Sequence, residues 1–224
     1  MKKAFTLLEL VFVIAIIGIL AAVILPRTKR SPTREAAIQL VSHIRYTQHL
    51  ALVDDKYLYD VTIPVDPSSD EHDRWWKARW QLKFEKSANS NNKWSYTIFS
   101  DHFGSSVYSG NPNSQTEIAT NPQNQQKKLT GGTSAIPYNH VKATTSMNIG
   151  TKYGISNVVF SNSCHQSIIF DYIGRPMTGT LASFSSPYPI NKLLVNDCNI
   201  TLVGQDENVS VIITPQTGYT YIAK

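Results

Sequence analysis

The chain begins with a long apolar run. From Phe5 to Leu25 it has one charged side chain, the carboxylate of Glu9. A helix of these 21 residues is about 30 Å long, the thickness of a bilayer's hydrocarbon core. The run therefore predicts the transmembrane half of an N-terminal helix over residues 5–25. A carboxylate inside a membrane is costly, so Glu9 is a candidate functional residue.

The next segment has the pattern of an amphipathic helix. Pro26 lacks a backbone donor and is expected to kink the helix, and Ser31 and Pro32 suit an N-cap and a first helical residue. Apolar residues then recur on one face: Ala37, Leu40, Val41, Ile44, Ala51 and Leu52. Polar residues fall on the other: Arg34, Gln39, His43, Arg45 and Gln48. This spacing predicts the amphipathic half of the helix over residues 26–56.

Residues 57–224 have the pattern of an antiparallel β domain, in which short apolar or alternating segments are separated by turn residues. They predict strands at 57–63, 76–84, 94–99, 155–160, 167–171, 193–203, 208–214 and 219–222. The segment 109–135 is rich in Asn, Gln, Ser, Thr and Gly, and we expect a long exposed loop there. The predicted fold is α+β, with a long transmembrane-plus-amphipathic helix packed on an antiparallel sheet.

Composition gives a mildly basic chain with two cysteines. The formal net charge of +5 falls to +3 without Lys2 and Lys3, which is too small to indicate a nucleic-acid-binding protein. The cysteines, Cys164 and Cys198, both lie in the C-terminal half. In an exported domain we expect them to pair, and two buried free thiols are the alternative.

The sequence shows no catalytic, cofactor or metal motif. It lacks the phosphate-binding P-loop, the H-E-x-x-H zinc motif, the G-x-S-x-G elbow and Cys-x-x-Cys. The six histidines are scattered, and we expect each to be charged and on a solvent face. The acidic segment 66–73 lacks the spacing of a calcium loop, which favours a solvated loop. Tryptophans alternate with Lys77 and Arg79, which indicates a strand with a core-facing aromatic side or, alternatively, base stacking.

The N-terminus resembles a known signal. A short basic leader, the small residue Ala4 and then Phe-Thr-Leu-Leu-Glu from Phe5 to Glu9 resemble the class III signal of type IV pilins and type II secretion pseudopilins. Ala4 stands where that family usually has glycine. The resemblance implies that residues 1–4 are a leader that prepilin peptidase removes, and that Phe5 is then N-methylated. It also implies that Glu9 directs assembly with other pilin or pseudopilin subunits.

Two later segments resemble one branch of this family. Residues 168–176, Ile-Ile-Phe-Asp-Tyr-Ile-Gly-Arg-Pro, are similar to the "phenylalanine, then glycine" signature of H-type minor pseudopilins and FimT-like pilins. Residues 211–218 are similar to their closing strand and Thr-Gly turn. The resemblance implies a minor structural subunit of a type II secretion pseudopilus or type IV pilus. Its N-terminus would be cytoplasmic, its helix in inner-membrane lipid and residues 57–224 periplasmic.

The sequence also allows three other interpretations: two concern the N-terminal segment and one concerns the whole protein. A cleaved secretory signal peptide fits poorly, because the apolar run is too long and contains Glu9. A plain membrane anchor explains the length of the run and the basic residues Lys2 and Lys3, but gives Glu9 no purpose. A DNA-binding minor pilin of a DNA-uptake pilus would need a basic groove on the exported domain.

Overall fold

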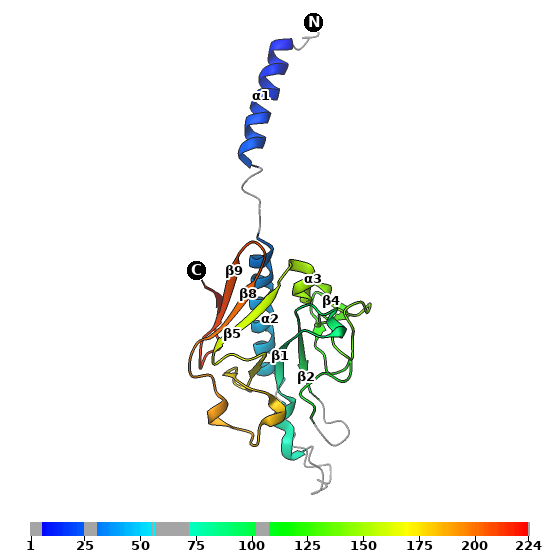
Figure 1. Cartoon of the computed structure of the whole chain (residues 1–224), viewed down its shortest axis with the longest axis vertical. Coiled ribbons are helices and arrows are strands. Elements are labelled where there is room, and N and C mark those ends of the chain that lie inside the picture. The colour runs from blue at the N-terminus through cyan, green and yellow to red at the C-terminus, as the bar shows by residue number, and fades with distance from the viewer. Residues whose placement is uncertain (1–5, 25–30, 55, 57–71, 102–107, 224) are drawn as a thin grey trace. The chain divides into compact units, whose positions relative to one another are not determined.

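The computed structural model describes residues 6–24, 31–54, 56, 72–101 and 108–223, which form two compact units, Met1–Ser31 and Pro32–Lys224. The first unit contains helix α1, Leu7–Ile24 (Figure 1). Among the described residues, no helix combines the length and the apolar character needed to cross a membrane. The predicted kink at Pro26 and the predicted strand at 57–63 lie outside the described residues.

In the second unit, helix α2, Pro32–Val53, confirms the predicted amphipathic pattern. It begins with Pro32, whose missing N–H would have no partner in a first helical turn. Its buried face is Thr33, Ala36, Ala37, Leu40, Val41, Ile44, Thr47 and Ala51. Leu52 was expected on this face but is 51% exposed. The small residues at this face let the helix approach the strands closely.

Two four-stranded antiparallel sheets pack on α2. In spatial order, the first sheet is β2 (Ser95–Ser100), β1 (Trp80–Glu85), β6 (Ser167–Phe170) and β7 (Pro176–Met177). The second is β10 (Thr220–Ile222), β9 (Asn208–Ile213), β8 (Cys198–Val203) and β5 (Asn157–Asn162). In Figure 1, β8 and β9 lie to one side of α2 and β1 and β2 to the other. The predicted α+β class is confirmed for this unit.

The main core joins α2 to both sheets. Leu40 and Ile44 of the helix meet Phe84 of the first sheet and Ile200 of the second, and all four are fully buried. Burying one such side chain stabilises a fold by roughly 1.5–3 kcal/mol. The rings of Phe84 and Tyr96 lie 5.6 Å apart between centroids, so aromatic packing joins the two strands of the β1–β2 hairpin within this core. This hairpin was predicted, and its antiparallel pairing is confirmed.

The strand predicted over residues 76–84 was wrong in its first part. A 3-10 helix, η2, covers His72–Ala78, and β1 begins only at Trp80. Trp75 and Trp76 make an edge-to-face contact with ring centroids 6.1 Å apart, and Trp75 is only 7% exposed. Adjacent residues of a strand point to opposite faces, so a tight turn is needed to pack both rings inward.

The segment 109–135 is packed against the first sheet, and the expectation of an exposed loop was wrong. It contains a two-stranded sheet of β3 (Thr120–Asn121) and β4 (Asn124–Lys128). Single bridges join Phe99 to Ile118 and Thr97 to Thr130, so the segment covers the outer edge of β2. Ile118 and Leu129 are 1% and 0% exposed. Ile118 packs in a small core with Phe99, whereas Leu129 belongs to the main core. Backbone hydrogen bonds to β2 satisfy polar groups of the segment along this edge.

The remaining short elements connect these layers. They are η3 (Ala88–Ser90), η4 (Thr145–Met147), α3 (Ile149–Tyr153), η5 (Leu181–Ser183) and η6 (Ile190–Lys192). Helix α3 is capped by Asn148, whose side chain accepts from the backbone N–H of Thr151. It packs on α2 and β2 and so closes the main core at that end.

Candidate processing and assembly site

The carboxylate of Glu9 forms hydrogen bonds with Thr6, the residue just before α1. Its Oε2 accepts hydrogen bonds from the backbone N–H and the hydroxyl of Thr6, both at 3.1 Å. In return the backbone N–H of Glu9 donates to Thr6 Oγ1 at 3.3 Å. This reciprocal pair is a capping box, in which a Thr and a Glu three residues later satisfy the helix's free donors. The Thr-x-x-Glu pattern in the sequence could have revealed this role.

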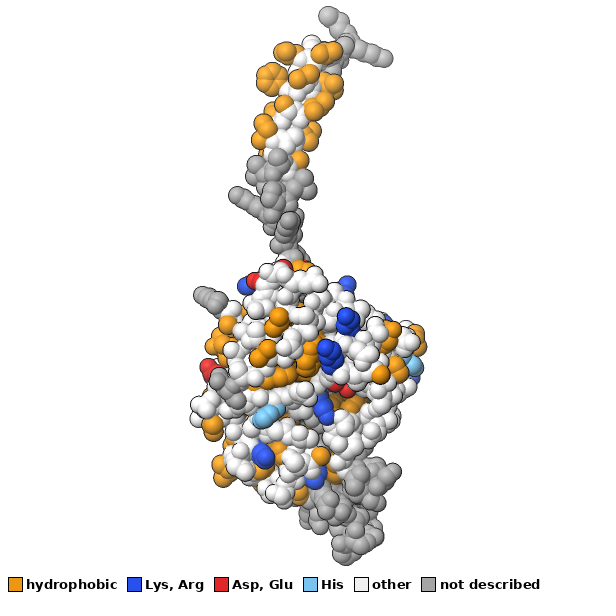
Figure 2. Space-filling view, in the orientation of Figure 1, with side chains coloured by type: hydrophobic (Ala, Val, Ile, Leu, Met, Phe, Trp, Pro, Cys, Tyr) orange, Lys and Arg blue, Asp and Glu red, His pale blue; other side chains and the backbone are white. Residues whose placement is uncertain are grey.

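Helix α1 has no polar face. Within its described part, Glu9 is the one charged residue, and the large apolar side chains are exposed to between 47% for Val13 and 82% for Leu7. Figure 2 shows apolar side chains along the visible length of this helix. A helix that is apolar all round needs burial in lipid or among other helices. The candidate cleavage residues, Ala4 and Phe5, lie outside the described residues.

In the second unit, four polar side chains form one directed chain of hydrogen bonds. The hydroxyl of Tyr153 donates to Gln39 Oε1 at 2.9 Å, and Gln39 Nε2 donates to the hydroxyl of Tyr96 at 2.7 Å. Tyr96 is fully buried and lies 2.8 Å from Nδ1 of His43. Because the oxygen of Tyr96 already accepts from Gln39, its proton is directed to His43.

Burial keeps His43 neutral, so the expected charged histidine on a solvent face was wrong. Burial lowers the pKa of His43 from 6.5 to about 4. Nδ1 then accepts from Tyr96, and the ring carries its proton on Nε2. The periodicity placed His43 on the polar side of α2, but β2 covers that side at this point through Tyr96. Sequence reasoning missed this network because its members are far apart along the chain.

The two segments that resemble the H-type branch meet at one side chain. Nε2 of Gln48 on α2 donates to the carbonyl oxygens of Gly174 and Thr217, each at 2.8 Å. Gly174 follows β6, and Thr217 precedes Gly218 in the turn between β9 and β10. A Cβ added to Gly218, whose φ is +65°, would lie 2.7 Å from Nε2 of Gln48 and 3.0 Å from the Phe170 ring. Glycine is therefore required where the helix and both turns converge.

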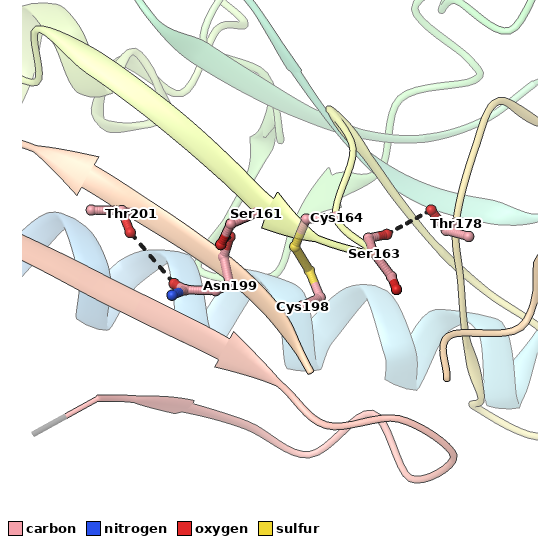
Figure 3. Close-up of a disulfide and its surroundings, with 7 residues drawn as sticks. All are labelled: Ser161, Ser163, Cys164, Thr178, Cys198, Asn199 and Thr201. Carbon is pink, nitrogen blue, oxygen red and sulfur yellow. Dashed lines mark hydrogen bonds between the residues drawn. A yellow bond between two sulfur atoms is a disulfide. The ribbon is translucent and has the colours of Figure 1, made fainter. Parts of the chain in front are cut away.

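A disulfide joins Cys164 to Cys198, as expected of an exported domain (Figure 3). It links the turn after β5 to the first residue of β8, with the two Cα atoms 4.8 Å apart. Both cysteines are buried. Next to it, the hydroxyl of Thr178 donates to the carbonyl oxygen of Ser163 at 2.7 Å, so the bridged turn is also tied to the end of the first sheet (Figure 3).

The basic segment near the tryptophans does not form a phosphate-binding face. Arg79 is 4% exposed, and its guanidinium carbon lies 5.5 Å from the centre of the Trp75 ring. Its Nη2 donates to the carbonyl oxygen of Pro187 at 2.7 Å, and Lys77 Nζ donates to that of Ala182 at 2.8 Å. Both cations bind groups of the protein itself, so the structure does not support base stacking on nucleic acid by this segment.

Acidic and histidine residues do not gather into a metal site in the part of the chain that the structure describes. Most of the acidic segment 66–73, the one calcium candidate of the sequence, lies outside that part. Its interpretation as a solvated loop stays a prediction.

Comparison with known proteins bears on the first unit. Residues 1–25 match the family described as the prokaryotic N-terminal methylation motif. No curated protein and no solved structure matches the chain. The match covers the basic leader, the candidate cleavage residues, the Thr6–Glu9 capping box and α1. The chain thus carries the N-terminal methylation motif of type IV pilins and pseudopilins, which supports its place in that superfamily.

Proposed function

We propose that this protein is a minor pseudopilin or pilin-like structural subunit of a type II secretion pseudopilus or type IV pilus. The observation that carries the proposal is the methylation motif over residues 1–25, which coincides with an apolar helix joined to a separately packed unit. The motif implies processing by prepilin peptidase and assembly with other pilin subunits. The first unit would lie in the inner membrane with its start in the cytoplasm, and the second would lie in the periplasm. The convergence of both H-type-like segments on Gln48 supports the minor-subunit assignment.

The processing step gives the direct test. A peptidase that cleaves between Ala4 and Phe5 needs a small residue before the cut. Mass analysis of the chain purified from membranes should give a mature N-terminus at Phe5 carrying one methyl group. Ala4→Glu should retain the leader, because a charged side chain cannot take the place of a small one. Ala4→Gly is the matched control and should be processed at least as fully as the natural chain. A mature N-terminus beyond Ala21 would contradict the proposal.

A second candidate is a DNA-binding minor pilin, and one group of residues favours it. Lys127, Lys128 and Lys142 lie on and beside β4 and donate only to neutral oxygens. None forms an ion pair with a carboxylate in the described ranges. The pKa of Lys128 is lowered by burial and then by the charge of Lys142, so the two ammonium groups repel each other. Phosphate groups would relieve this repulsion.

Salt dependence separates the two functions. The full chain in detergent would be titrated with duplex DNA at several salt concentrations. Binding through phosphates predicts that affinity falls steeply with salt, and that Lys127→Ala together with Lys142→Ala reduces the slope by about two. Lys192→Ala, in η6, is the control. Equal weak binding by all variants would exclude the DNA-binding function and leave the structural role as the only proposal.

A further inference from the structure

An apolar groove lies between α2 and β10, the outermost strand of the second sheet. Its volume is about 400 Å³, within the range of about 300–1,000 Å³ that is typical of binding pockets. Ile38 of α2 is 56% exposed, so a large apolar side chain of the helix faces solvent here. Within the described ranges, the lining includes no acidic residue and consists of Ile38, Val41, Ser42, Arg45, Tyr221 and Ile222.

The outer edge of β10 has an unused backbone donor and acceptor at Ile222. The N–H of Ala223 donates to the carbonyl of Ser210 at 2.8 Å, and the N–H of Thr214 donates to that of Tyr219 at 2.9 Å. Hydrogen-bonded positions alternate along an antiparallel pair, so the N–H and C=O of Ile222, between these positions, point away from β9. No strand of the described part of the chain pairs with this edge. An unpaired edge is a template for another strand.

A cation is held beside this edge. Nη2 of Arg45 on α2 donates to the carbonyl oxygen of Thr220 at 2.7 Å, which shows that the outer edge of β10 faces the helix. The guanidinium carbon lies 5.7 Å from the centre of the Tyr219 ring, which is stacked on that of Tyr221. Arg45 is exposed and forms no ion pair with a carboxylate among the residues that the structure describes. Its other N–H groups are therefore available to an anion in the groove.

We propose that the groove binds an extended, acidic segment of a partner protein. One residue of the segment would pair with Ile222 through two backbone hydrogen bonds, and a neighbouring carboxylate would bind Arg45. An apolar side chain of the segment would lie against Ile38 and Val41. The free backbone groups favour a strand, because a helix satisfies its own N–H and C=O groups and offers none to Ile222. The cation without a counter-charge favours an acidic partner.

The test begins with a random heptapeptide library displayed on phage and the full chain held in lipid nanodiscs. We expect enrichment of peptides that carry Asp or Glu beside β-branched or aromatic residues, which favour strands. Arg45→Gln should weaken binding of the synthesised peptides by about tenfold or more, because Gln can still donate to Thr220 but has no charge. Lys152→Gln removes an exposed cation from α3 and is the matched control, which should leave the affinity unchanged.

N-methylation along the backbone of a selected peptide tests the strand pairing without changing the protein. Each methyl group removes one backbone donor. Residues of an added strand alternate between donating to β10 and facing away from it. Methylation of the residue that pairs with Ile222 should therefore weaken binding by about tenfold or more, and methylation of the residues on either side should have little effect.

Three results would overturn the proposal: selected peptides without an acid, equal affinity for Arg45→Gln and the natural chain, or equal effects of N-methylation at all positions. Self-association of the full chain that Arg45→Gln abolishes would also overturn it, because a second copy would then be the occupant. The groove belongs to the second unit and does not depend on assembly through α1. Processing at Ala4 is measured separately, so failure here leaves the proposed function standing.

Discussion

If the chain assembles as proposed, the carboxylate of Glu9 has two roles, one within its own helix and one between subunits. Within one chain it caps α1 through Thr6, which donates two hydrogen bonds to the carboxylate but brings no opposite charge. In an assembly, its charge would instead meet the new α-amine of a neighbour's Phe5, the pairing that the family resemblance implies. A charge pair in a low-dielectric bundle is far stronger than the same pair at a surface.

Substitution at two positions separates these roles. Glu9→Gln keeps a capping side chain but removes the charge, and Thr6→Ala removes the cap but keeps the charge. We expect Glu9→Gln and Glu9→Leu to reach the membrane fraction yet to fall about tenfold in co-purified pilin complexes. Thr6→Ala should assemble nearly normally. The measurement is an immunoblot of membranes beside a pull-down of the complex. Normal yield of Glu9→Gln would show that capping is its whole role.

His43 should make stability depend on pH. Its folded pKa of about 4 lies below the unfolded value of 6.5, so the stability that the neutral ring contributes is complete above pH 6.5. As pH falls from 6.5 to about 4, the unfolded chain gains a proton that the folded chain does not, and up to about 3 kcal/mol is lost. His43→Asn should flatten this dependence in denaturant unfolding of the full chain. The exposed His49→Gln is the control, and an unchanged pH profile in His43→Asn would contradict the assignment.

At the scale of elements, Gln48 joins α2 to the turns that follow β6 and β9. Gly218→Ala should destabilise the chain by about 2–4 kcal/mol, through a positive φ and the close approach of Gln48 Nε2 and Phe170. Gly154→Ala is a matched control, because its φ is +71° but the nearest atom would be 4.0 Å away. It should lose only about 1 kcal/mol. If thermal or denaturant unfolding shows the same loss of stability for both variants, the close packing around Gly218 does not contribute to stability.

The disulfide acts between elements that hydrogen bonds already join. β5 and β8 are paired along six residues, from Asn157–Val203 to Asn162–Cys198, and the bridge closes their connection at the far end. A sequence separation of 34 corresponds to about 3–4 kcal/mol in the chain-entropy description. Cys164→Ser with Cys198→Ser should lose about this much. Non-reducing mass analysis of the exported chain should show two hydrogens fewer than the thiol form, and two alkylatable thiols would contradict both the bridge and the compartment.

At the scale of the whole molecule, the two units differ in the surface that they present. The apolar α1 and its methylation motif would serve the proposed assembly, whereas the second unit buries most of its large apolar side chains in its cores. Segment 109–135 covers the outer edge of β2, which protects that edge from pairing with another chain. A structural subunit that must associate through chosen surfaces benefits from a covered edge.

Local patterns in the sequence determined the elements that depend on near neighbours. The apolar run gave α1, a period of 3.6 residues gave the buried face of α2, and alternation with turn residues gave most strands. The Thr6–Glu9 cap was also readable, because its partners are three residues apart. The cysteine pair followed from there being only two cysteines and from the exported compartment that the N-terminus implied.

The tertiary structure decided which surfaces are covered and by what. Periodicity tells which side of an element is polar, but a polar side can be buried when another segment satisfies it. His43 meets Tyr96 across 53 residues, and Lys83 meets the carbonyl of Gly110 across 27. The same long-range packing turned both tryptophans of η2 inward and ordered a polar segment along β2. These features depend on contacts between distant segments, which a local pattern does not record.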